Sequence, residues 1–255
     1  MKLEDYGELF AYELAFWSQG LTNPAYGISE LGDLSLDLST KFRALAIMAL
    51  LVKGDHTLFC HNLIRSAMSR RTYLLRVRAD GALQDHHFAS GRYGPMLDAI
   101  SAGDLGLARE IGNLAPTSWR KEAEYQEDYC YAQILRMLVD AAQRPELEPL
   151  LAQFEAYTEG AANSRLDVCR ALVVRDKDLF EEAFGGLLRE RELQIAADEE
   201  RGQLEVPEVV AERQVFVEGL AVLRLADTLG MPTQREYRYC PSLARLPMDE
   251  PFPGE

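Results

Sequence analysis

The sequence predicts an all-α fold, arranged either as an irregular helical-hairpin bundle or as an α-solenoid-like stack. Apolar residues recur at three- and four-residue spacings along most of the chain, and short turns containing Gly or Pro separate these segments. The turns are unevenly spaced, so no strict repeat is expected. Because no Pro-, Gly- or Ser-rich linker divides the chain, we expect a single domain over residues 1–255, with a loosely ordered tail over about 247–255.

The N-terminal third predicts three helical segments followed by a less regular one. Residues 6–17 are amphipathic, and the helix within 40–53 stops at Gly54, a typical C-terminal residue. Residues 56–71 continue after a short turn and complete a helical hairpin. The segment 72–90 alternates over too few residues to distinguish a strand from a helix end. We therefore expect it to be irregular, and its Asp80-Gly81 turn allows a small hairpin.

The remaining chain predicts helices joined by short turns. Residues 95–116 form two short helices around Gly103-Asp104, and 118–143 form one long helix that ends near Pro145. Asp178 and Glu181 resemble a capping box, and Pro207 suits the first turn of a helix that ends at Gly230. The other predicted helices lie within 145–160, 163–176 and 177–200.

The composition is that of a soluble acidic protein. The formal net charge is −14, from 41 acidic and 27 basic residues. Such a chain is repelled by nucleic acids and by anionic membranes, and it suits a basic protein partner, although acidity also serves solubility. No apolar run is long enough to span a membrane and the N-terminus lacks the features of a signal peptide, so we expect a cytoplasmic protein.

Signatures of catalysis or cofactor binding are few. The four cysteines are far apart in the sequence, and we expect them to be reduced and buried in the core. His86 and His87 lie beside Asp85 and could bind a metal in a loop, but an exposed polar loop is the simpler interpretation. There is no phosphate-binding loop, nucleophile elbow or zinc motif. We expect no enzyme activity, no cofactor and no metal.

Two charged clusters are candidate interaction sites. Five arginines lie between residues 65 and 78 and suggest either an anion patch or, as the overall charge favours, internal bridges to carboxylates on neighbouring helices: Arg65, Arg70, Arg71, Arg76 and Arg78. In the stretch 122–131, acidic residues alternate with tyrosines, a combination suited to binding a basic protein. Its candidate partner-binding residues are Glu124, Tyr125, Glu127, Asp128 and Tyr131, and the alternative is a tyrosine face in the core beneath a solvated acidic face.

One carboxylate interrupts the most apolar helix of the chain. Glu218 lies at the edge of the apolar arc of the helix within 214–230, where an unpaired carboxylate would cost about 1–3 kcal/mol. A structural role is therefore favoured, through an arginine of another helix or a backbone donor. We hypothesise that this arginine belongs to the segment Arg65–Arg78. Gly219 and Ala226 leave a shallow strip on which another helix can approach closely.

Five stretches in order resemble the immunity protein 49 family of bacterial polymorphic toxin systems. The resemblance covers about residues 90–246 and is carried by "PMLDAISAGDLGLAREIGNLAP", "EYQEDYCYAQILRML", "RALVVRDKDLFEEAFGGLLRER", "FVEGLAVLRLADTLG" and "YRYCPSLARLP". It implies a mainly α-helical protein that binds and neutralises a cognate toxin without catalysis or cofactor. It carries over no toxin-contacting residues.

Two other functions remain open at this point. A helical-repeat adaptor would bind several protein partners in a concave groove, whereas an immunity protein would bind one. An enzyme on an all-α scaffold would reverse a toxin's modification, and it would act below equimolar amounts. Neither the toxin nor the oligomeric state follows from the residues.

Overall fold

A computed structural model describes residues 3–140, 147–202 and 206–253 of the chain. Within these residues the chain forms eleven α-helices and no β-strand, which confirms the all-α fold. Their bounds are α1 Leu3–Trp17, α2 Ile28–Lys53, α3 His56–Asp80, α4 Gly94–Ala102, α5 Leu105–Leu114, α6 Gln126–Val139, α7 Leu147–Tyr157, α8 Ser164–Val174, α9 Lys177–Glu200, α10 Pro207–Glu212 and α11 Val217–Thr228. None of the helices in these residues is both long and apolar enough to cross a bilayer.

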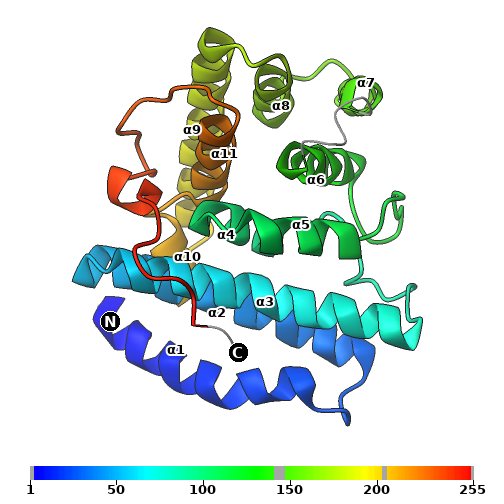
Figure 1. Cartoon of the computed structure of the whole chain (residues 1–255), viewed down its shortest axis with the longest axis vertical. Coiled ribbons are helices and arrows are strands. Elements are labelled where there is room, and N and C mark those ends of the chain that lie inside the picture. Colours follow the sequence, from blue (N-terminus) through cyan, green and yellow to red (C-terminus); the bar gives the residue numbers. More distant parts are fainter. Residues whose placement is uncertain (1–2, 141–146, 203–205, 254–255) are drawn as a thin grey trace.

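The helices pack around α4 rather than in a row. In Figure 1, α1, α2 and α3 form a layer at one end of the molecule, and α4 and α5 lie along α3. Helices α6 to α9 continue away from this layer, and α11 returns to pack against α4. The arrangement is therefore an irregular bundle, one of the two predicted forms.

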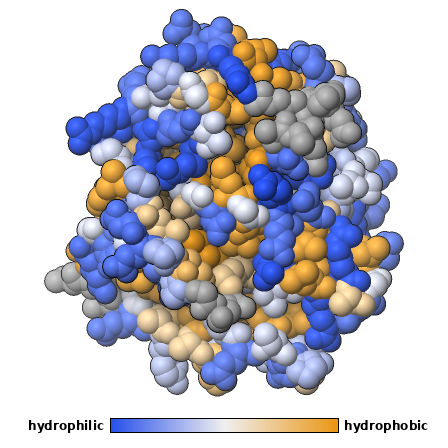
Figure 2. Space-filling model, in the orientation of Figure 1, coloured by the Kyte–Doolittle hydropathy of each residue, from blue (hydrophilic) through white to orange (hydrophobic). Residues whose placement is uncertain are grey.

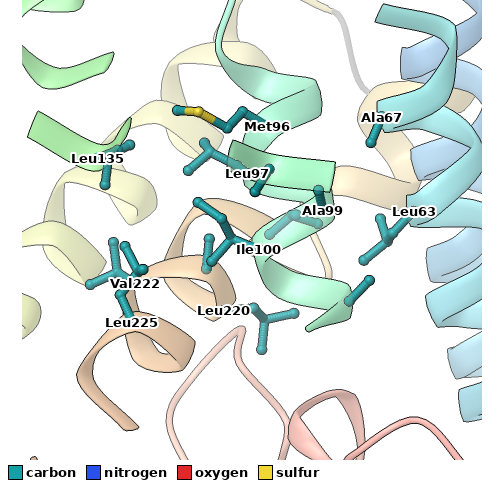
Figure 3. Packing of buried hydrophobic residues seen from close by; sticks show 14 of the residues in the cluster. Leu63, Ala67, Met96, Leu97, Ala99, Ile100, Leu135, Leu220, Val222 and Leu225 are labelled. Atoms are coloured by element: carbon teal, nitrogen blue, oxygen red, sulfur yellow. The ribbon is translucent and has the colours of Figure 1, made fainter. Parts of the chain in front are cut away.

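Helix α4 is the centre of the hydrophobic core. Every residue from Pro95 to Ala102 is buried. Figure 3 shows Met96, Leu97, Ala99 and Ile100 between Leu63 and Ala67 of α3 on one side and side chains of α6 and α11 on the other. A helix covered all round has no solvated face, so each polar group on it must find a partner inside the protein.

Most predicted helix ends are confirmed. Gly54 and Gly103 adopt positive φ angles of 63° and 85°, where a side chain would be strained, and they end α2 and α4. The side chain of Asp104 then accepts a hydrogen bond from Leu107 N–H and caps α5. The cap of α9 is Asp176, which accepts from the N–H groups of Asp178 and Leu179, so the capping box predicted at Asp178 was wrong.

Two segments differ from the sequence prediction. The segment 72–90 contains no hairpin, because α3 continues to Asp80 before a series of turns. Tyr73, Leu74 and Val77 are buried on one helical face, which stabilises this extension. The helix predicted to begin at residue 118 begins at Gln126 instead, and its predicted end near Pro145 lies outside the described residues.

The C-terminal region also differs from the sequence prediction in its helices. The helix predicted from Pro207 to Gly230 is divided into α10 and α11 by a short break. Beyond α11, Cys240 is fully buried in the core. In the tail, Glu250 O lies 3.2 Å from His61 Nε2, and the Phe252 ring packs edge-on against the His61 ring on α3.

The buried polar network of α4 connects it to three other helices. Arg43 of α2 donates two hydrogen bonds, of 2.6 and 2.8 Å, to the fully buried carboxylate of Asp98 on α4. Ser66 of α3 donates to the same carboxylate, and Glu212 of α10 lies 3.2 Å from Arg43 Nη1. The pKa of Arg43 is raised despite its burial, because both carboxylates favour the charged guanidinium.

We predict that Arg43→Met destabilises the fold strongly, because it leaves Asp98 as a buried carboxylate without its cation. The expected loss in the free energy of unfolding is about 3–5 kcal/mol. Arg76→Met removes an exposed pair with Asp80 within α3 and should cost no more than about 0.5 kcal/mol. Urea unfolding of both variants measures the difference, and equal losses would contradict the role assigned to Arg43.

Candidate functional site

The carboxylate of Glu218 is paired, but with a different arginine from the one predicted. Arg165 of α8 forms a two-point contact with it, with Nε and Nη2 lying 2.7 and 2.8 Å from the two carboxylate oxygens. The hypothesis that Glu218 pairs with the segment Arg65–Arg78 is therefore wrong. The Glu218 side chain is only 12% exposed and its contact with Arg165 joins α11 to α8, an arrangement that favours a structural role.

The Arg165–Glu218 pair lies over two tyrosines and a second carboxylate. The Arg165 guanidinium is 5.2 Å from the ring centre of Tyr131 and 5.8 Å from that of Tyr93, within range of cation–π attraction. Asp128 of α6 accepts a hydrogen bond from Tyr93 OH and lies 3.6 Å from Arg165 Nη1. The pKa of Arg165 is raised although burial opposes this, because Glu218 stabilises its charge.

Gly219 allows a close approach, though by a loop rather than by the helix expected. A Cβ on Gly219 would lie 2.6 Å from the Phe216 ring and 2.7 Å from Cys240 Sγ. The backbone of the loop is fixed there by the Phe216 N–H, which donates to Tyr239 O at 2.8 Å. The absence of a side chain on Gly219 therefore lets the C-terminal segment pack directly on α11.

Two hollows open on either side of the ion pair. The α9 hollow, of about 600 Å³, lies between α8, α9, α10 and α11, and Arg165 and Glu218 form part of its wall. The α6 hollow, of about 400 Å³, lies at the start of α6. The Asp128–Arg165–Glu218 chain connects their walls. On the face shown in Figure 2, apolar side chains are visible in the middle of the molecule, with hydrophilic residues around them.

The residues predicted to bind a partner have different positions. Tyr125 is 77% exposed, lines the α6 hollow and directly precedes α6. The carboxylate of Glu124 lines the same hollow, but it accepts hydrogen bonds from Gly91 N–H and Arg120 N–H. These bonds, together with the one that Trp119 Nε1 donates to Glu124 O, hold residues 119–124 in a turn. They explain why this segment does not continue the helix.

The other three predicted residues lie on α6, and their positions around the helix decide whether they are exposed or buried. Glu127 and Asp128 are partly exposed in the first turn of α6, and burial raises the pKa of Asp128 even though Arg165 lies nearby. Tyr131 is fully buried, so its assignment as a partner contact was wrong. Its ring packs edge-on against Tyr93 at 5.3 Å and lies beneath Arg165. Tyr131 therefore supports the ion pair from inside the protein.

The five arginines of α3 have mainly structural roles. Arg71 pairs with Glu110 of α5 at 2.7 Å, as predicted for bridges between helices. The others differ from that prediction: Arg65 donates to Asn62, Arg70 to His87 O and Ala89 O, Arg76 to Asp80 of its own helix, and Arg78 to Leu114 O and Ala115 O. Two of the five arginines thus pair with carboxylates, two donate to backbone carbonyl groups and one donates to an amide side chain.

His87 is engaged in hydrogen bonds within the protein. Its Nε2 lies 2.9 Å from Asp33 on α2 and its Nδ1 lies 3.1 Å from Asp85. Ligand atoms of Asp85, His86 and His87 come within 4.8 Å of one another, the spacing of a metal site. Both ring nitrogens of His87 are already occupied by carboxylates, which favours a structural interpretation. The four cysteines are free and buried, as predicted.

A comparison with protein families identifies the chain. The family model of immunity protein 49 matches residues 89–244, more than half of the chain. The chain belongs to the immunity protein 49 family. No curated protein and no solved structure matches the sequence. The match agrees closely with the resemblance over residues 90–246.

The part that matches the immunity protein 49 family contains the whole candidate site. It includes α4 to α11 and therefore Tyr93, Asp128, Arg165 and Glu218. Helices α1 to α3 precede the match, yet Arg43 of α2 supplies the cation for Asp98 of α4. The buried carboxylate of the matched segment is thus compensated by an arginine from a helix that precedes the match.

Which residues formed the site was only partly visible in the sequence. An acidic residue on an apolar helix indicated that a cationic partner existed for Glu218. Arg165 lies 53 residues away in a helix with several charged residues, and nothing local distinguishes it. Tyr93 was also missed, because it lies in a segment without clear periodicity.

We predict that Glu218 and Arg165 are energetically coupled. In a double-mutant cycle of Glu218→Gln and Arg165→Met, the coupling free energy should be about 1–2 kcal/mol, because Glu218→Gln removes the negative charge and one of the two acceptors, whereas Arg165→Met removes both donors. The cycle of Glu218→Gln with Arg71→Met should be additive, since Arg71 pairs with Glu110 elsewhere. Urea unfolding measures both cycles. Additivity in the first cycle would exclude the assigned pairing.

Proposed function

We propose that this protein binds and neutralises one cognate bacterial toxin, by stoichiometric occlusion and without making or breaking a bond. Membership of the immunity protein 49 family carries this proposal. The net charge of −14 supports a basic toxin as the partner. The protein would act in the compartment that the toxin threatens, the cytoplasm of the producing cell.

We assign the contact surface to the α6 hollow and the α9 hollow, which adjoin across the Arg165–Glu218 pair. Seven carboxylate and four cationic side chains line them, so a basic partner is favoured. Tyr125 is the exposed aromatic residue of this surface, and tyrosine combines apolar area with a polar tip. The ion pairs beneath hold the walls rigid, which lowers the entropy cost of binding.

Electrostatic attraction would bring the two proteins together. A negatively charged surface increases the association rate of a positively charged partner and orients it before contact. A toxin that acts on nucleic acid needs a basic groove for its substrate, and an acidic surface placed over that groove would exclude the substrate. The adaptor alternative lacks comparable support, because α4 packs between α3, α5 and α11 and the described helices form no regular stack.

We predict complete inhibition at an equimolar ratio. The purified protein is titrated against the toxin domain encoded beside its gene, and residual toxin activity is measured at each ratio. A stoichiometric binder leaves activity in proportion to the excess of toxin. Protection at a small fraction of one equivalent would instead indicate a catalytic antidote, and an absence of inhibition at excess would contradict the proposed function.

We predict that Tyr125→Ala weakens toxin binding by about tenfold or more, the effect of losing an aromatic anchor. Tyr12→Ala is the matched control, because Tyr12 is equally exposed at 77% but lies on α1, outside the family match. Binding is measured by calorimetry, and unfolding temperatures check that both variants remain folded. Equal affinities for the two variants would remove Tyr125 from the contact surface.

A further inference from the structure

Arg70 is an unusual buried charge. It lies in the middle of α3 and is only 1% exposed. Its Nη2 donates to His87 O at 2.8 Å and to Ala89 O at 3.1 Å, and its guanidinium lies 5.0 Å from the ring centre of Tyr73. Its Nη1 is buried and has no hydrogen-bond partner in the described part of the chain. No carboxylate forms an ion pair with it there.

Arg70 faces a small cavity that two further arginines also line. The cavity has a volume of about 20 Å³ and lies between α3, α5, α6 and the turn before α4. Arg136 of α6 contributes to its wall, and its buried Nε also has no partner among the described residues. Arg92 is the third. Gly112 makes room for Arg136, since a Cβ there would lie 2.6 Å from Arg136 Cγ.

The lining of this cavity has a charge opposite to that of the protein. The residues that the structure places around it include three arginines but no aspartate or glutamate, although the chain carries a net charge of −14. The polar groups of Ser90 and Gln133, the other hydrogen-bonding side chains apart from Tyr93, already bond to each other and to Pro116 O. The cavity wall is thus positively charged, and the carboxylates that act on Arg70 from a distance, Asp85 and Glu124, lie outside this wall and form no ion pair with Arg70 in the described residues.

Burial alone does not remove this charge. Burial lowers the pKa of Arg70 to about 10, which still leaves the side chain protonated at neutral pH. A buried, unpaired cation is costly, and proteins normally compensate it with an opposite charge. A single water could accept a hydrogen bond from Nη1 but would supply no charge.

The size of the cavity selects the ligand. A cavity needs about 10–15 Å³ to hold one water, so a volume of about 20 Å³ accommodates one group of that order. A carboxylate, phosphate or sulfate has several heavy atoms and exceeds this volume. A monatomic anion does, and it accepts hydrogen bonds from any direction.

We propose that this cavity binds one chloride ion, held by Nη1 of Arg70 and by the positive field of Arg136 and Arg92. The ion links α3 to α5 and α6, directly behind the turn that carries Tyr93. Bound chloride would therefore stabilise the turn that positions Tyr93 in the candidate site. The proposal is independent of toxin binding and can be tested on the free protein.

The first test is thermal unfolding at constant ionic strength, in sodium chloride and in sodium gluconate. Bound chloride should raise the unfolding temperature by about 2–4 °C relative to gluconate, a larger anion that the cavity excludes. Arg70→Met should abolish this difference. Arg71→Met, which removes the neighbouring arginine that pairs with Glu110, should retain it. No difference in the wild type, or the same difference in Arg70→Met, would overturn the proposal.

A second test needs no variant, in case Arg70→Met does not fold. Crystals of the wild-type protein are soaked in sodium bromide, and anomalous diffraction locates the bromide ions. A bromide peak inside the cavity beside Arg70 Nη1 is the expected result. A water in that position with bromide only on the protein surface, or an empty cavity, would overturn the proposal.

Discussion

The structure depends on the complete burial of α4. A helix of nine residues with no solvated face can be placed only if its polar groups are satisfied from outside itself. Among these polar groups Asp98 most needs a partner, because it is a fully buried carboxylate. Arg43 and Ser66 meet this demand from α2 and α3, and Ser101 of α4 donates to Val217 O at the start of α11. The polar contacts of one short helix thus fix the relative positions of the layers around it.

Buried charged side chains in this protein have two kinds of environment. Asp98 and Glu218 each receive a two-point contact from one arginine, a geometry that combines charge compensation with fixed orientation. Arg70 instead donates hydrogen bonds to two backbone carbonyl groups, packs against an aromatic ring and forms no ion pair in the described residues. The first arrangement holds the walls of the proposed binding surface, and the second leaves a charge that an external ion can balance. Both lie inside a protein whose surface is strongly acidic.

The sequence predicted local features well and long-range pairings poorly. Gly54 was recognised as the end of a helix and Gly103-Asp104 as the break between two helices, because such breaks are properties of one or two residues. The start of α6 was missed, because hydrogen bonds of Glu124 with Gly91 and Arg120 override the helical preference of that segment.

The candidate site shows the same limit. Glu218 could be recognised as a paired carboxylate, since its place on an apolar helix is a local property. Its partner Arg165 could not, because the choice among 27 basic residues depends on how α8 packs against α11. Tyr131 was misplaced for a related reason: it alternates with acidic residues in sequence, yet its helical phase directs it into the core.

Hydrogen exchange of the backbone amides tests the central place of α4 most directly. If the fold depends on its burial, the amides of α4 should be among the slowest to exchange and should open only with global unfolding. The amides in the exposed C-terminal part of α9 should exchange much faster. An α4 that exchanges as rapidly as that part of α9 would contradict the account, because the helix would then open without disrupting the rest.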